Sequence, residues 1–332
     1  MVKTKAEPAA DGSRKARTPQ QYLGLVLRGM AMGASDIVPG VSGGTMAFIL
    51  GIYEELINSI KKVGDRDFLK AVTSFNIRQA ERLLNWPFLV AVATGIGISI
   101  LTLSRGLEYL LLNQPVYLWS FFFGLVLASV VLVARRVEEW TPLVIGMLAL
   151  AALGAFILVG LVPAQTPNAA WFLFLSGGLA ICAMVLPGVS GAFVLVLLGK
   201  YQFVLGAVNQ LTDGNFSGDA LTTIVSVGAG AAVGIVTFAQ LFSWLFKRYH
   251  NMTVAILTGL MIGSLRKIWP WKVTLETMLD SHGEPFPVVQ QNVLPALTDY
   301  SAGQIGLAIG LMAAGALAVL LLDYLANRKE NS

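Results

Sequence analysis

The residues of this chain whose types and spacing best suit chemistry form two copies of the motif Pro-Gly-Val-Ser-Gly. They occupy residues 39–43 and 187–191, so 187 − 39 = 148 positions separate them. The register persists, because Leu-Gly-Ile-Tyr at 50–53 recurs as Leu-Gly-Lys-Tyr at 198–201. Glycine lets a ligand approach the backbone closely, and serine supplies a hydroxyl donor. The repeated motif therefore predicts a pair of related binding segments.

The composition indicates that both motifs lie in a membrane. Of the 332 residues, 55% are hydrophobic and only 13% are charged, whereas soluble domains carry about a quarter charged residues. We therefore predict an all-α integral membrane protein. A Pro-Gly break at membrane depth must be buried in protein or line an aqueous cavity, because lipid cannot satisfy the freed backbone groups. Broken helices in corresponding positions of two halves are typical of transporter binding sites.

The chemistry expected at the breaks is anion binding. A helix that restarts there presents unpaired N–H groups and the positive end of its dipole, which suit a phosphate. The candidate substrate-binding residues are those of the motifs and their continuation: Gly40, Val41, Ser42, Gly43, Gly44, Thr45, Gly188, Val189, Ser190 and Gly191. The alternative is that glycines only permit close helix packing. We favour that alternative for Gly51 and Gly199.

Basic residues near the apolar segments are further candidates for contact with a phosphate. Arg28 lies two turns before the first break, and Arg105 and Arg266 lie near the ends of predicted spans. The competing interpretation of each is an interfacial anchor whose charge reaches the membrane surface. For Lys267, next to Arg266, we favour the anchor.

Asp36 makes the two breaks different, because its counterpart at 36 + 148 = 184 is Met184. A carboxylate at membrane depth is costly unless it is paired, coordinated or protonated. Asp36 is therefore a candidate coupling site for a proton or Na⁺. A helix cap, or an ion pair with Arg28, is the alternative.

Enzymatic and nucleic-acid functions fit the sequence poorly. Residues 40–43 match the Gly-x-Ser-Gly pattern of intramembrane serine proteases, but such a serine needs a base. The only histidines, His250 and His282, fall in predicted loops. The single cysteine, Cys182, belongs to no metal-ligand spacing, so we expect neither a metal nor a cofactor. The net charge is only +4 and the basic residues flank apolar spans, so we expect no nucleic-acid partner.

The elements that must position the motifs form two similar series. Each series begins with a broken, re-entrant hairpin, at Tyr22–Ile60 and Trp171–Leu211, and the first hairpin has predicted arms Tyr22–Val38 and Val41–Ile60. Three predicted spans of about 20 apolar residues follow each hairpin. They cover Pro87–Leu103, Val116–Ala134 and Pro142–Val162 in the first series, and Leu221–Phe246, Thr253–Ile268 and Ile305–Tyr324 in the second. A long loop, Trp269–Tyr300, precedes the last span.

The number of spans sets the relation between the series. Three full spans, an odd number, separate the two motifs, so the second motif must face the opposite side of the membrane. This predicts inverted repeats over residues 21–165 and 166–326, with a disordered basic tail at 1–20 and a short tail at 327–332. Lys and Arg concentrate on the side of the N-terminus, which predicts that both termini are cytoplasmic.

One long stretch carries a family resemblance. Residues 33–45, Gly-Ala-Ser-Asp-Ile-Val-Pro-Gly-Val-Ser-Gly-Gly-Thr, and residues 50–54, Leu-Gly-Ile-Tyr-Glu, closely resemble a bacterial membrane family. That family, formerly a domain of unknown function, is now assigned as polyprenyl-phosphate (undecaprenyl phosphate) transporters. The second motif and residues 259–271 resemble it as well, so the match spans about residues 20–325. Ser35, where the family often has alanine, is a departure from its pattern.

The resemblance implies a flippase for a lipid carrier. Undecaprenyl phosphate would return from the outer to the cytoplasmic leaflet of the bacterial inner membrane, for reuse in cell-envelope glycan synthesis. The implied partners are a polyprenyl phosphate lipid and the bilayer. An ion-coupled transporter of a small soluble anion, a lipid phosphatase and a structural subunit are the alternatives, and the sequence leaves a homodimer open.

Overall fold

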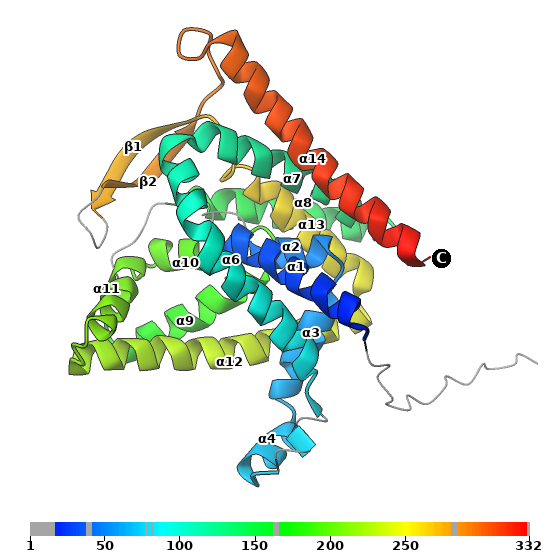
Figure 1. Ribbon diagram of the computed structural model, residues 1–332, viewed down its shortest axis with the longest axis vertical. Coiled ribbons are helices and arrows are strands. Elements are labelled where there is room, and N and C mark those ends of the chain that lie inside the picture. Colours follow the sequence, from blue (N-terminus) through cyan, green and yellow to red (C-terminus); the bar gives the residue numbers. More distant parts are fainter. Residues whose placement is uncertain are drawn as a thin grey trace, which may run out of the picture.

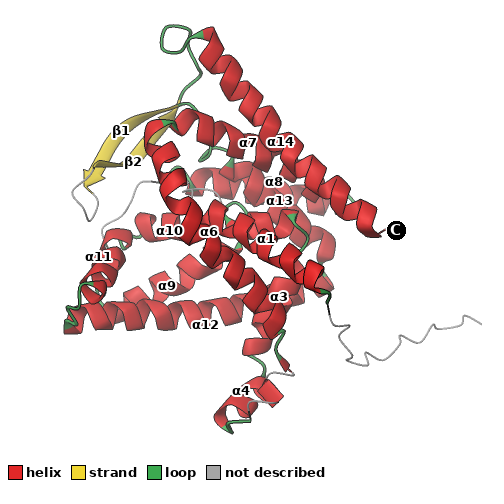
Figure 2. Cartoon of the chain, in the orientation of Figure 1, coloured by secondary structure: helices red, strands yellow, loops and turns green. Residues whose placement is uncertain are grey.

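A computed structural model describes residues 17–37, 42–76, 79–80, 83–161, 166–279 and 285–330 of the chain. This part is mostly helical, as Figures 1 and 2 show. The first series of helices is α1 (Pro19–Ile37), α2 (Gly43–Ile49), α3 (Tyr53–Val63), α4 (Arg66–Thr73), α6 (Trp86–Asn113), α7 (Pro115–Ala134) and α8 (Pro142–Leu158). The second series is α9 (Ala170–Val185), α10 (Gly191–Leu197), α11 (Tyr201–Thr212), α12 (Gly218–Arg248), α13 (His250–Ser264) and α14 (Ala302–Glu330).

Four of the described helices, α6, α7, α12 and α14, are long and apolar enough to cross a membrane. The pair α10 and α11 would form a fifth crossing segment, bent by 111° at its break. Helix α8 covers a predicted span but has only 17 residues, and α13 has 15. The prediction of a mostly helical protein with several apolar membrane helices is confirmed.

The second predicted arm of the first hairpin, Val41–Ile60, contains two helices in its described part. Helix α2 ends at Ile49, and α3 starts at Tyr53 after a turn in which Gly51 has φ +71°. Gly199 has φ +63° at the corresponding turn between α10 and α11. A left-handed backbone strongly favours glycine. A Cβ on Gly51 would meet no atom within 4 Å, so this glycine serves the turn rather than close packing.

Helices from the two series pack in matching pairs. Helix α1 packs on α6 as α9 packs on α12, and α7 packs on α14 as α8 packs on α13. Glycines make these approaches close: a Cβ on Gly124 of α7 would overlap a backbone carbonyl of α14, and one on Gly259 of α13 would overlap a carbonyl of α8. The last two pairs each join a helix of one series to a helix of the other, so the halves interlock.

The loop before α14 holds the clearest departure from the predicted all-α fold. Strands β1 (Lys272–Leu279) and β2 (Pro285–Asn292) form an antiparallel pair, drawn yellow in Figure 2. The described β1 sequence, Lys-Val-Thr-Leu-Glu-Thr-Met-Leu, carries β-branched residues that favour strands. The indole of Trp269 donates to the carbonyl oxygen of Val293 at 2.8 Å, which holds the base of the hairpin to the end of α13.

The α1–α6 contact yields a test with a matched control in one helix. A Cβ at Gly95 would overlap the carbonyl oxygen of Val26, whereas a Cβ at Gly97 would meet nothing within 4 Å. We expect Gly95→Ala to lower the free energy of unfolding by about 1–3 kcal/mol through overpacking. Gly97→Ala should be neutral or slightly stabilising, because alanine favours the helix by roughly 0.5–1 kcal/mol. Thermal unfolding in detergent measures both, and equal midpoints would contradict the proposed packing.

Candidate functional site

The two breaks, which are far apart in the sequence, are hydrogen-bonded to each other. The hydroxyl of Ser42 donates to the carbonyl oxygens of Met184 at 3.0 Å and Leu186 at 3.1 Å, which share its proton. In the other direction, the N–H of Gly188 donates to Oγ1 of Thr45 at 2.9 Å. Ser42 and Thr45 are each only 1% exposed. The side chains of the first break therefore satisfy backbone groups freed at the second.

Both short helices begin with the same kind of cap. Ser42 precedes α2, and its Oγ accepts from Gly44 N–H at 3.1 Å. Ser190 precedes α10, and its Oγ accepts from Phe193 N–H at 3.5 Å. The equivalence extends to the bounds of the helices, because 43 + 148 = 191 and 49 + 148 = 197. The sequence repeat is thus also a repeat of local structure.

Asp36 bridges the first break. Its Oδ1 accepts from the N–H of Gly43, the first residue of α2, at 2.7 Å. A Cβ on Gly43 would overlap this carboxylate, so glycine is what admits it. A carboxylate at this end of a helix is stabilised by the dipole. The structure therefore gives Asp36 the role of a helix cap, and Arg28, half-buried on α1, forms no hydrogen bond or ion pair with any described residue.

The corresponding place in the second break is apolar. A Cβ on Gly191 would lie 3.1 Å from the Cβ of Met184, so Met184 packs where Asp36 forms its bond in the first half. The difference between the halves that the sequence indicated is present in the structure. One break contains an anion of the protein itself, and the other does not.

We call the contact between residues 42–45 and residues 184–188 the junction. Two further glycines let separate backbones meet there. A Cβ on Gly44 would overlap the carbonyl oxygen of Val185, whereas its counterpart Ala192 is exposed. Gly188 has φ +87°, and a Cβ there would approach Oγ of Ser264, at the end of α13, to 2.9 Å. The junction therefore brings α2, the second break and α13 into direct contact.

The remaining predicted site residues have different surroundings. Gly40 and Val41 lie outside the described residues, as does the side chain of Arg105 on α6. Val189 is buried in the second break. Arg266 donates from Nη1 to the carbonyl oxygen of Phe156 at 2.9 Å and stacks over its ring, so it binds the C-terminal end of α8.

Two lysines that we did not predict as site residues contact each other, and one of them, Lys267, contacts the short helix after the second break. Nζ of Lys267 sits 4.7 Å from the ring centroid of Phe193 on α10, so this side chain packs inward instead of anchoring at the surface. Nζ of Lys272 lies 4.1 Å from the ring centroid of Trp119 and donates to the carbonyl oxygen of Lys267. No sequence motif marks Lys272, because only the fold brings β1 to α7.

A third lysine, Lys200, is buried at the turn between α10 and α11, where the first half has Ile52. Its Nζ donates to the carbonyl oxygen of Thr166 at 2.7 Å and to Oδ1 of Asn168. These two neutral acceptors tie the segment before α9 to the hairpin. The arrangement gives Lys200 a clear structural role.

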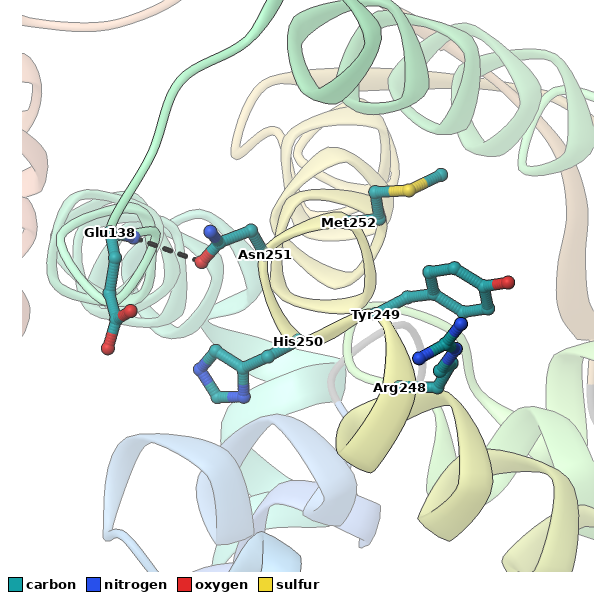
Figure 3. Close-up of a pocket in the computed structure, with 6 residues that line it drawn as sticks. All are labelled: Glu138, Arg248, Tyr249, His250, Asn251 and Met252. Atoms are coloured by element: carbon teal, nitrogen blue, oxygen red, sulfur yellow. Dashed lines mark hydrogen bonds between the residues drawn. The ribbon is translucent and has the colours of Figure 1, made fainter. Parts of the chain in front are cut away.

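A cavity of about 400 Å³ lies at the turn between α12 and α13 (Figure 3). It is lined by Glu138, Arg248, Tyr249, His250, Asn251 and Met252. Oδ1 of Asn251 accepts from the N–H of Glu138 at 3.1 Å across one side of it. The 15 residues of α13, about 22 Å of helix, run from this cavity to Ser264 at the second break. The cavity is therefore separate from the junction.

Aromatic contacts connect this cavity to the first hairpin. The ring of His250 lies 6.1 Å from that of Phe246, which lies 6.5 Å from Phe48 of α2. The guanidinium of Arg136, just after α7, lies 5.1 Å from the Phe48 ring centroid. Each short helix thus carries one aromatic ring covered by a cation.

Among the described residues, no group of His, Cys, Asp and Glu side chains could hold a metal ion.

Comparison with known proteins identifies the family. The family described as VCA0040-like, undecaprenyl phosphate translocase-like, matches residues 32–286, which include both breaks. The chain belongs to this family. A relative from Vibrio cholerae named polyprenyl-phosphate transporter is 40% identical over 311 residues, covering 92% of this chain and 98% of the relative. One of the same name from Staphylococcus aureus is 30% identical over 257 residues, covering 74% and 85%. No solved structure matches.

The bond between Thr45 and Gly188 can be tested in this family member directly. Thr45→Val keeps the shape of the side chain but leaves the buried N–H of Gly188 without its acceptor, at a cost of about 1–3 kcal/mol. We expect faster hydrogen exchange in peptides that contain Gly188, together with a lower unfolding midpoint. Thr45→Ser retains the acceptor and is the control. If Thr45→Val exchanges at the wild-type rate, this bond does not hold the breaks together.

Proposed function

We propose that this protein transports polyprenyl phosphate, returning undecaprenyl phosphate from the outer to the cytoplasmic leaflet of the bacterial inner membrane for reuse in envelope glycan synthesis. Family membership and two relatives named polyprenyl-phosphate transporters support the substrate. The observation that carries the proposal is the hydrogen-bonded junction of two helix breaks, a place where polar backbone is available inside an apolar protein.

The architecture in this proposal is a pair of inverted repeats. The shared bounds of α2 and α10, and the pairing of α7 with α14 as α13 pairs with α8, support two equivalent halves. If the 17-residue α8 spans as α6 and α7 do, three spans separate the breaks and the halves face opposite sides. The concentration of Lys and Arg supports cytoplasmic termini. Rocking of one half against the other would open the junction to each leaflet in turn.

The headgroup site in the proposal is the set of predicted motif residues at the junction. A bare phosphate cannot cross hydrocarbon, as for any isolated ion, so the protein must replace its water with N–H and O–H donors. Ser42, Ser190 and the amides that follow them would be such donors once they leave their present partners. The Ser42 hydroxyl donates to the carbonyl oxygens of Met184 and Leu186, and Gly44 and Phe193 donate to the serine caps. The N–H of Gly43 is already bound to the Asp36 carboxylate. A phosphate that uses this amide must therefore displace Asp36.

Coupling in the proposal follows from this competition. Neutralising Asp36, with a proton or with Na⁺, weakens its bond to Gly43 and removes its repulsion of phosphate. The ion that neutralises Asp36 would then travel with the lipid.

The decisive experiment is a flip assay with the full-length chain in proteoliposomes. A fluorescent short-chain polyprenyl phosphate should equilibrate between leaflets faster with the protein than in protein-free vesicles, at several pH and Na⁺ values. The matching polyprenol, which lacks phosphate, is the control and should not be accelerated. Uptake of soluble inorganic phosphate would favour the small-anion transporter, and release of phosphate from the lipid would favour the phosphatase.

Asp36→Asn tests the competition. Asparagine keeps an acceptor oxygen for Gly43 but removes the charge, which at about 5 Å and an effective dielectric of 20 is worth roughly 3 kcal/mol, or about a hundredfold. We expect tighter binding of the prenyl phosphate, with weaker dependence of binding and flipping on pH and Na⁺. Glu54→Gln, at an exposed position of the same hairpin, is the matched control. Wild-type affinity and ion dependence in Asp36→Asn would exclude Asp36 as the competing anion.

A further inference from the structure

Lys267 and Lys272 form a pair of cations that the junction itself does not explain. Both side chains are half-buried, and Nζ of Lys272 donates to the backbone oxygen of Lys267. Each ammonium also covers an aromatic face, Phe193 for Lys267 and Trp119 for Lys272. The Lys272 ammonium thus lies against the backbone of Lys267, and each of the two ammonium groups lies over an aromatic ring.

No carboxylate among the described residues forms an ion pair with either lysine. Removing a charge from water without a partner is costly, and like charges nearby add to that cost. Burial and the charge of Lys267 lower the pKa of Lys272 to about 7. The helix and strand packed against Lys272, α7 and β2, contain no charged residue. Glu276, on β1 itself, is exposed and forms no ion pair with Lys272. Among the described residues, such a pair lacks a counter-ion.

The pair adjoins the second break. Phe193, under Lys267, is the residue of α10 whose N–H is bound by the cap Ser190. The end of α13, three residues before Lys267, contacts Gly188 through Ser264. The short helix of the first half also has a cation over a ring, although at its other end: Arg136, after α7, covers Phe48 near the C-terminus of α2. A cation beside the short helix is therefore common to both halves.

We propose that Lys267 and Lys272 are the counter-charges for a phosphomonoester at the second break, the first protein groups to bind the headgroup on the side of the β1–β2 hairpin. This deepens the proposed function and rests on it. By the charge distribution of the chain, that side is the outer one. Two ammonium groups provide charge-assisted donors for the phosphate oxygens, and the aromatic walls keep competing water away.

Binding of farnesyl phosphate to the detergent-solubilised full chain tests the pair. We expect Lys267→Met and Lys272→Met each to weaken affinity roughly tenfold or more, through loss of a charge-assisted bond. Methionine keeps the apolar contact with the ring, and removing a buried charge should not unfold the protein, which thermal unfolding checks. Lys267→Arg and Lys272→Arg should retain most of the affinity. Lys247→Met, at an exposed position of α12, is the matched control.

Amine labelling gives a second measurement that a structural role would not change. A lysine with a lowered pKa has a larger neutral fraction at pH 7.5 than an ordinary lysine and so reacts faster with acetic anhydride, whereas a bound phosphate favours its charged form. Farnesyl phosphate should therefore slow acetylation of Lys272, measured by peptide mass spectrometry, but not of Lys247. Inorganic phosphate in a parallel arm shows whether the free anion is held as well as the lipid.

The outcomes separate this inference from the proposed function. Wild-type protein that neither binds farnesyl phosphate nor accelerates flipping would overturn the proposed function. Wild-type protein that flips the lipid, with Met variants that bind and flip equally well and no protection of Lys272, would overturn only the lysine pair. Protection by inorganic phosphate alone would also overturn it as a lipid headgroup site.

Discussion

The constraint on which this structure depends is that a helix broken inside an apolar protein must find partners for the backbone groups it frees. Here each break finds part of them in the other break. Ser42 and Thr45 bind the carbonyls and the amide at residues 184–188, and glycine at position 44 lets the two backbones meet. The packing of α7 on α14 and of α8 on α13 joins the first series of helices to the second around this junction. The hydroxyls of Ser42 and Thr45 and the backbone groups at 184–188 are thereby kept together in the interior of the protein.

The sequence predicted most of this framework because the framework is local and repeated. The 148-residue offset predicted that the two breaks correspond, and in the structure α2 and α10 each follow a serine cap and end two residues before a glycine turn. The bounds of these two short helices were not predicted. The same pattern misled us at Gly51. Close packing and a left-handed turn both demand glycine, and only the backbone angle distinguishes them. The β1–β2 hairpin was missed although β1 carries β-branched residues, because the segment was interpreted only as a long loop between two apolar spans.

The features that escaped prediction are the ones that depend on distant residues. Nothing near Lys272 in the sequence indicates that it will meet Trp119, more than 150 positions away, and Arg266 could not be assigned to Phe156 before α8 and α13 were seen to pack. The bond from Asp36 to Gly43 spans only seven residues, yet it requires the geometry of the break, which a motif does not encode.

The symmetry of the framework makes its chemical differences informative. If both breaks served only to hold the halves together, equivalent positions could carry equivalent residues. Instead the first break has the Asp36 carboxylate where the second has Met184. Thr45 of the first half corresponds to Phe193 of the second, whose ring is covered by Lys267. Positive charge thus lies at one end of the junction and negative charge within the other. In the proposed mechanism, an anion bound first at the lysines would occupy the first break only when Asp36 releases Gly43. The same bond that stabilises the junction would then also control passage through it.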